Sequence, residues 1–163
     1  MKTMRAIPLI LTAVSACLFV PAGACAAATS PLAGRWSLDV AHVAMPPEQR
    51  PRRVTLAFDE VAGGGWSTRV EIVDAQGKAT HAQGVLALDG TPAKVSGDYG
   101  ADLAAARMPA PGVLVMQLAS GGVPASTRIY SVAADGRTMT ETKAFFGRDG
   151  QPVLQSNTFV RVP

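Results

Sequence analysis

Turn-forming residues recur at short, even intervals along the chain from about Gly34 to its end. Asp-Gly, Gly-Gly and similar pairs separate runs rich in Val, Thr, Phe and Tyr, and no long segment repeats its apolar residues with a helical period. Strands spaced by about 8–12 residues are typical of a β-sandwich or a β-barrel. We therefore predict an all-β fold with roughly eight to ten strands.

Successive turns of this kind connect neighbouring antiparallel strands, so the chain is expected to form a meander. A long meander must close on itself or form two layers to protect its edges, and we expect a single antiparallel up-and-down β-barrel. The segment 101–108 is compatible with either a strand or one helical turn. The Pro-rich segment 44–51 is expected to cross one end of the barrel in an extended form. The expected strands are 34–39, 52–61, 66–74, 80–89, 94–100, 112–120, 123–133, 138–146 and 152–162.

Two Asp-Gly pairs near the end of the chain, at Asp135 and Asp149, are compatible with either acidic metal loops or turns. A calcium loop needs several oxygen ligands at close spacing and ends in a bidentate carboxylate. Asp135 has no acidic neighbour before Glu141, which lies inside an expected strand, and none follows Asp149. We therefore predict hairpin turns in which glycine adopts positive φ.

The first 28 residues have the pattern of a secretory signal peptide, which leaves 29–163 as the barrel domain. Lys2 and Arg5 precede an apolar run, and small residues follow Pro21. The predicted location is therefore the periplasm or the exterior of the cell. Small residues before Cys17 keep a lipid anchor open as an alternative, with Cys25 as a poorer match. The apolar run is short for a membrane span, which needs about 20 residues.

Removal of this leader changes the charge of the chain and its cysteine content. Both cysteines lie in the leader, so the mature chain would have no disulfide, thiol nucleophile or cysteine metal site. Thirteen basic residues would remain against twelve acidic ones, which argues against nucleic-acid binding.

Three stretches resemble a group of small secreted bacterial proteins, largely of unknown function, with a lipocalin-like β-barrel. These are "GRWSLDVAHV", "VEIVDAQGKATHAQGVLALDGTPAKVSG" and "YSVAADGRTMTETKAFFGRDGQPV". The resemblance spans about Gly34 to Val162 and implies a barrel that carries a ligand. The cysteine pair of many lipocalins is absent from the expected barrel. Trp36 is expected to plug the closed end of the barrel.

The candidate ligand-binding residues are Arg128, Tyr130, Glu141 and Lys143. Alternate residues of a strand share a face, which places Arg128 beside Tyr130 and Glu141 beside Lys143. The "RIY" stretch resembles the Arg-x-Tyr arrangement with which fatty-acid-binding proteins hold a carboxylate. The competing interpretation, which we favour, is an exposed Arg128 paired with Glu141 on the neighbouring strand.

The remaining residues offer little for catalysis or for a cofactor. His42 and His81 lie on different segments, and neither has a second ligand at metal-binding spacing. We find no nucleophile elbow, phosphate loop or cofactor motif. We therefore expect a protein that is not an enzyme, has no cofactor, and binds a small apolar or anionic amphipathic ligand. The alternative is a filled barrel that engages a protein partner.

Overall fold

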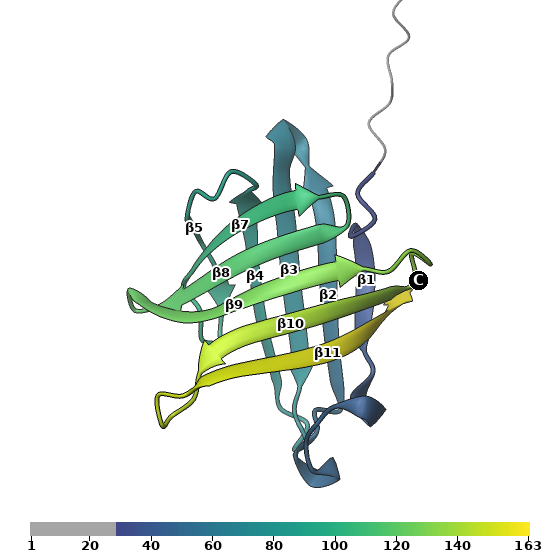
Figure 1. Cartoon of the computed structure of the whole chain (residues 1–163), viewed down its shortest axis with the longest axis vertical. Helices are drawn as coiled ribbons and strands as arrows, with labels where there is room; N and C mark the ends of the chain where they lie inside the picture. The colour runs from purple at the N-terminus through teal and green to yellow at the C-terminus, as the bar shows by residue number, and fades with distance from the viewer. Residues whose placement is uncertain (1–28) are drawn as a thin grey trace, which may run out of the picture.

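The computed structural model describes residues 29–163, which form one antiparallel sheet of eleven strands (Figure 1). The predicted signal peptide and both cysteines lie outside the described residues. Three short 3-10 turns, η1 (Val40–His42), η2 (Pro47–Gln49) and η3 (Ala62–Gly64), accompany the strands. The strands are β1 (Gly34–Leu38), β2 (Arg53–Val61), β3 (Gly65–Val73), β4 (Ala79–Ala87), β5 (Ala93–Lys94), β6 (Ser96–Gly97), β7 (Leu103–Ala110), β8 (Val113–Ser120), β9 (Val123–Val132), β10 (Thr138–Phe146) and β11 (Pro152–Val162).

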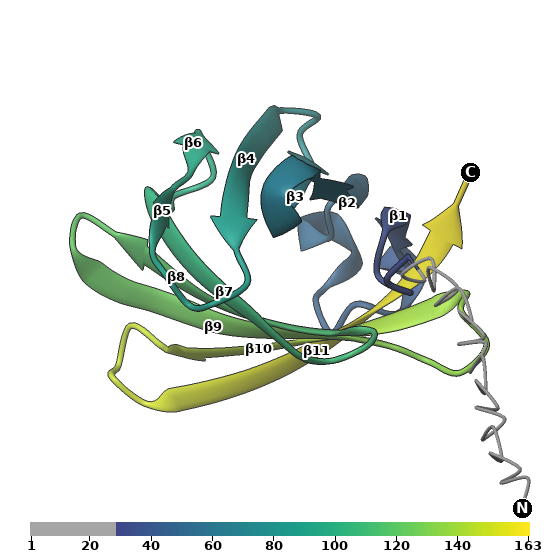
Figure 2. The ribbon, with the colours of Figure 1, turned by 90° about the horizontal axis from the view of Figure 1, so that it is seen from above.

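The strands form a nearly closed barrel, which confirms the predicted fold class. Their order in the sheet is β5-β7-β8-β9-β10-β11-β1-β2-β3-β4-β6. The first and last long strands, β1 and β11, pair in antiparallel register, with Trp36 opposite Arg161. The remaining seam lies between β4 and β7, where an isolated bridge joins Asp89 to Arg107. Figure 2 shows β1 to β4 and β7 to β11 as two curved layers on opposite sides of the interior.

The structure has eleven strands because the Gly-containing segment after β4 forms two very short strands. β5 and β6 contain two residues each, and they pair with different partners, β7 and β4. The segment at 101–108, compatible by sequence with a strand or a helical turn, contributes residues 103–108 to strand β7. The Pro-rich crossing contains η2 in place of a fully extended path, since Pro47 occupies the first position of that turn.

The two Asp-Gly pairs form turns, as predicted. Gly136 has φ of 64° and Gly150 has φ of 76°, values that favour glycine. The Asp135 carboxylate accepts hydrogen bonds from the backbone N–H groups of Arg137 and Thr138, at 2.8 and 2.9 Å. These bonds to the charged form hold the pKa of Asp135 below its ordinary value. The carboxylate therefore stabilises the turn.

Large side chains fill one end of the barrel. Trp36 and Trp66 are buried completely or almost so, together with Phe58, Leu114 and Met139. Trp36 Nε1 donates a hydrogen bond to the carbonyl of Leu32, and the Arg161 guanidinium lies 4.2 Å from the Trp36 ring centroid. The expected role of Trp36 as a plug agrees with this packing.

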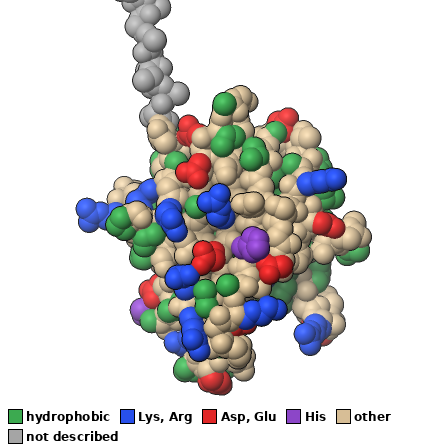
Figure 3. Space-filling model, turned by 180° about the vertical axis from the view of Figure 1, so that it is seen from behind, with side chains coloured by type: hydrophobic (Ala, Val, Ile, Leu, Met, Phe, Trp, Pro, Cys, Tyr) green, Lys and Arg blue, Asp and Glu red, His purple; other side chains and the backbone are tan. Residues whose placement is uncertain are grey.

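The outer surface carries charges of both signs. On the face of the molecule seen in Figure 3, basic and acidic side chains are interspersed with polar ones, so no single-sign patch dominates it. Within residues 29–163, no helix has the length and apolar character required to cross a membrane.

Candidate functional site: a cavity at one end of the barrel

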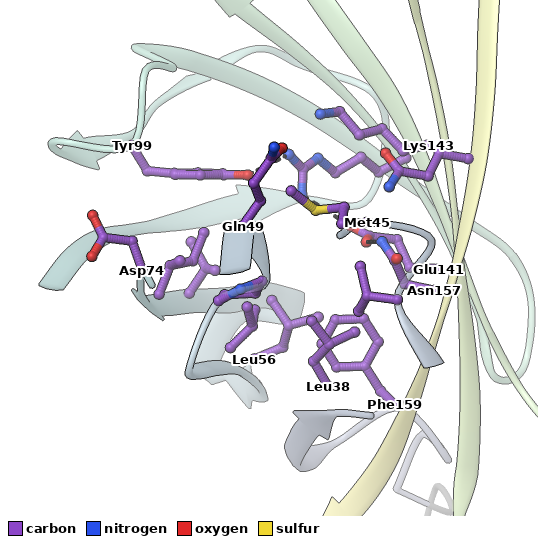
Figure 4. A pocket seen from close by; sticks show the side chains of 17 residues that line it. Leu38, Met45, Gln49, Leu56, Asp74, Tyr99, Glu141, Lys143, Asn157 and Phe159 are labelled. Carbon is purple, nitrogen blue, oxygen red and sulfur yellow. Dashed lines mark hydrogen bonds and ion pairs between the residues drawn. The ribbon is translucent and has the colours of Figure 1, made fainter. Parts of the chain in front are cut away.

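The interior holds a cavity of about 300 Å³ at the end opposite the tryptophan-filled core. The segment that contains η1 and η2 lies below β1 and β2 in Figure 1 and contributes Val43, Met45 and Gln49 to the wall. The close-up in Figure 4 shows the lining side chains gathered around this space. The other lining residues are Leu38, Pro51, Val54, Leu56, Val70, Ile72, Asp74, Tyr99, Arg128, Glu141, Lys143, Gln155, Asn157 and Phe159.

The wall of the cavity is apolar on one side and polar on the other. Strands β1, β2 and β3 contribute only aliphatic side chains, because their inward positions alternate with polar outward ones. Strands β9, β10 and β11 carry two rows of polar side chains, all of which line the cavity except Tyr130, which lines the smaller second cavity. Tyr130, Glu141 and Asn157 are paired directly across these strands, and Arg128, Lys143 and Gln155 form the adjacent row. We call these six residues the polar rows.

The Glu141 carboxylate lies at the centre of the polar rows and accepts three hydrogen bonds. Its Oε1 atom accepts from Arg128 Nη1 at 2.9 Å and from the Tyr130 hydroxyl at 3.1 Å. Its Oε2 atom accepts from Asn157 Nδ2 at 3.0 Å. Glu141 and Arg128 are buried, with 4% and 9% of their surfaces exposed. The pair is therefore an internal ion pair.

Tyr99 holds the other side of the Arg128 guanidinium. Its hydroxyl accepts a hydrogen bond from Arg128 Nη2 at 3.1 Å, and its ring centroid lies 5.5 Å from the guanidinium carbon. Tyr99 and Arg128 also border a second, smaller cavity of about 50 Å³ toward Phe58 and Met116. The Arg128–Tyr99 contact therefore stands between the two interior spaces.

The protonation states in the polar rows follow from burial and from the ion pair. Burial alone lowers the pKa of Arg128, but Tyr130, Tyr99 and Glu141 around it outweigh burial and raise that pKa above its ordinary value. Burial and the nearby Glu141 raise the pKa of Tyr130. Arg128 therefore remains a cation and Tyr130 remains a neutral donor at physiological pH.

Two buried polar atoms of the rows have no hydrogen-bond partner among the described residues. These are Arg128 Nε and Asn157 Oδ1. Buried polar groups in folded proteins are almost always paired with protein atoms or with water. The polar rows therefore keep one donor and one acceptor unsatisfied.

The structure places all four predicted site residues side by side on β9 and β10: Arg128, Glu141 and Lys143 line the cavity, and Tyr130 lines the smaller second cavity. The Arg128–Glu141 pairing is present, but the expectation that it is exposed is wrong, because both strands turn these residues into the barrel. Arg128 and Tyr130 do donate hydrogen bonds to a carboxylate, but this carboxylate is the side chain of Glu141. Asn157 and Tyr99 belong to the site but were not predicted from the sequence. Strand alternation with Phe159 could have found Asn157, whereas Tyr99 lies on a loop with no pattern to mark it.

Other ionisable groups are dispersed. Among residues 29–163, no group of three or more His, Cys, Asp or Glu side chains is placed to hold a metal ion. His42 contacts Asp39 at 2.7 Å, and His81 lies 3.5 Å from Asp98. Both contacts lie on the surface, away from the cavity.

The fold and the site together define a small antiparallel β-barrel with an amphipathic interior cavity. This architecture is compatible with the lipocalin-like class that the sequence resembles. No protein-family model matches the chain, and no curated protein matches it.

Proposed function

We propose that this protein binds a small amphipathic molecule inside its barrel and is not an enzyme. The main observation in support is the cavity of about 300 Å³ with one aliphatic wall and one polar wall. Ligand pockets in proteins begin at about this volume and combine apolar surface with a few polar groups that orient the ligand. A short apolar chain or ring with one polar end fits such a wall.

The hydrogen bonding of Glu141 supports a binding role over catalysis. General acid–base work needs a carboxyl group that can reach a substrate proton. Both oxygens of Glu141 already accept hydrogen bonds from Arg128, Tyr130 and Asn157. The buried carboxylate is therefore occupied by hydrogen bonds within the protein and is not free to exchange a proton with a substrate.

We further propose that the protein acts in the periplasm or outside the cell, as a member of the lipocalin-like group. This part of the proposal draws on the leader and on the three stretches that resemble that group. The intact mass of the exported protein would locate the cleavage site and reveal any lipid on Cys17 or Cys25.

Titration with octan-1-ol tests the binding proposal. Octan-1-ol added to the ¹⁵N-labelled protein should shift the amide signals of Leu38, Val70, Ile72 and Phe159, which line the cavity. Val70→Phe fills part of the space and should weaken binding by about tenfold or more, equivalent to about 1.4 kcal/mol. Val70→Leu fills less of the space, so its octan-1-ol affinity should lie between those of the wild type and Val70→Phe.

Val85→Phe is the matched control, because Val85 lies on the outer face of β4 with 57% of its surface exposed. It should leave octan-1-ol binding unchanged. Absence of shifts up to the solubility limit of the alcohol would contradict the proposal.

The alternative, a filled barrel that engages a protein partner, draws on another surface. Phe146 and Leu154 are 75% and 77% exposed, and both border an outer hollow of about 310 Å³ with Pro124 and Ala144. Shifts confined to this outer hollow, with none at the interior residues, would favour the alternative.

A further inference from the structure

We propose that Lys143 receives the anionic head of the ligand, so that the cavity selects a small monoanionic amphiphile. This inference rests on the proposed binding function and names the chemistry of its ligand. Lys143 is one of the four ligand-binding residues predicted from the sequence, but that prediction assigned the ligand's carboxylate to Arg128 and Tyr130.

Arg128 is already neutralised within the protein. Its guanidinium donates to Glu141 and to Tyr99, and the Tyr130 hydroxyl donates to the same Glu141 oxygen. A ligand carboxylate at Arg128 would have to displace Glu141, which would leave a buried charge without its partner at a large cost. An incoming anion is therefore directed elsewhere in the polar rows.

Lys143 is the second cation of the polar rows and lies directly opposite Arg128 on the neighbouring strand. Like charges in directly opposed positions repel each other. Glu141 compensates one of the two charges, so Arg128, Lys143 and Glu141 together carry one net positive charge. Lys143 forms no ion pair with any residue in 29–163. One bound anion would balance this group.

The surroundings of Lys143 suit an anionic head. Its Nζ atom lies 4.4 Å from the Phe145 ring centroid, and its side chain lines both the cavity and an adjoining hollow of about 260 Å³. Gln155 is paired with Lys143 across β11 and also lines the cavity, so its amide can act as a second donor.

The other acid in the cavity wall, Asp74, lies on the opposite side of the space from Lys143 (Figure 4). Its Oδ1 atom accepts hydrogen bonds from the backbone N–H groups of Gln76 and Lys78 in the β3–β4 turn. Asp74 therefore leaves the charge of Lys143 uncompensated, and the ligand's apolar part would extend toward Leu38 and Val54.

Binding of octanoate and octan-1-ol to matched lysine variants tests this inference by isothermal titration calorimetry. Lys143→Met keeps the length of the side chain and removes the charge, and it should weaken octanoate binding by about tenfold or more. The same variant should change octan-1-ol affinity less than about twofold. Lys94→Met, at an exposed position of β5 that borders neither the cavity nor the hollow beside Lys143, should alter neither affinity. Lys143→Gln provides a second test if the methionine variant folds poorly.

The outcomes separate the two proposals. If neither octanoate nor octan-1-ol binds, the binding function itself fails. If both bind and Lys143→Met leaves the ratio of their affinities unchanged, the assignment of Lys143 is overturned while the binding function stands. The inference is supported if Lys143→Met weakens octanoate binding but not octan-1-ol binding, and Lys94→Met changes neither.

Discussion

The Arg128–Glu141 pair can be predicted from the sequence, but its contribution to stability depends on whether it is buried. An exposed ion pair contributes little to stability, because water screens it and two long side chains must be ordered. A buried pair has lost its hydration, so each partner depends on the other. Arg53 and Glu71 form an exposed pair on β2 and β3, with 58% and 43% of their side chains accessible. The two pairs therefore allow a direct comparison within one barrel.

We expect Glu141→Leu to lower the free energy of unfolding by about 3–5 kcal/mol, because it leaves Arg128 buried without its partner. Glu71→Leu, the exposed counterpart, should change it by no more than about 1 kcal/mol. Urea denaturation followed by circular dichroism measures both.

The double variant Arg128→Met/Glu141→Leu is the control for charge. It should recover much of the loss, because apolar residues of similar size often replace a buried ion pair without cost. Equal destabilisation by Glu141→Leu and Glu71→Leu would contradict the buried pair.

At the scale of elements, the segment of β5 and β6 decides how the barrel seam is built. Gly97 has φ of 128°, and a Cβ atom at this position would lie 2.1 Å from the carbonyl oxygen of His81 on β4. The backbone of β6 approaches β4 too closely for any side chain. Gly100, three residues later, has φ of 71° and no atom within 4 Å of a Cβ.

Gly97→Ala should destabilise the barrel more than Gly100→Ala. The Gly100 variant carries only the cost of positive φ, about 1–2 kcal/mol. The Gly97 variant adds a clash with backbone atoms and must move β6 away from β4. Thermal unfolding and hydrogen exchange of the β4 amides measure the difference. Equal melting temperatures for the two variants would show that the close approach at Gly97 is wrong.

At the scale of the whole molecule, β11 joins the two ends of the meander. It pairs with β10 along its length and with β1 at its end, where Phe159 lies opposite Leu38. Phe159 is 2% exposed, whereas Leu154 on the same strand is 77% exposed. The inward-facing side chains of β11, such as Phe159, therefore close the barrel, and the alternate side chains, such as Leu154, face solvent.

Phe159→Ala should lower the free energy of unfolding by about 3–5 kcal/mol, because it opens a void where the barrel closes. Leu154→Ala should change it by about 0.5 kcal/mol or less, since it removes only exposed surface. Guanidinium denaturation of the two variants provides the measurement. A comparable loss in both would contradict the assigned faces of β11.

The sequence by itself determined the longer strands, the turns and which residues share a face of a strand. Alternation placed Arg128 with Tyr130 and Glu141 with Lys143, and Asp-Gly pairs marked the hairpins, because these features depend on neighbours along the chain. The meander also predicted a closed antiparallel barrel. The two-residue strands β5 and β6 escaped prediction, since a pattern needs more than two residues.

Only the tertiary structure decided which face points inward and what meets there. Both faces of β10 mix polar and apolar residues, so alternation cannot tell interior from exterior. The pairings of β10 with β9 and β11 align Glu141 with Tyr130 and Asn157. Closure of the barrel, with β11 paired to β1, turns Glu141 inward and brings Tyr99 from a distant loop onto Arg128. The inward direction and the Tyr99–Arg128 contact depend on residues far apart in the chain. The burial that makes Arg128 and Glu141 an internal pair, with Lys143 as the remaining cation, follows from that closure.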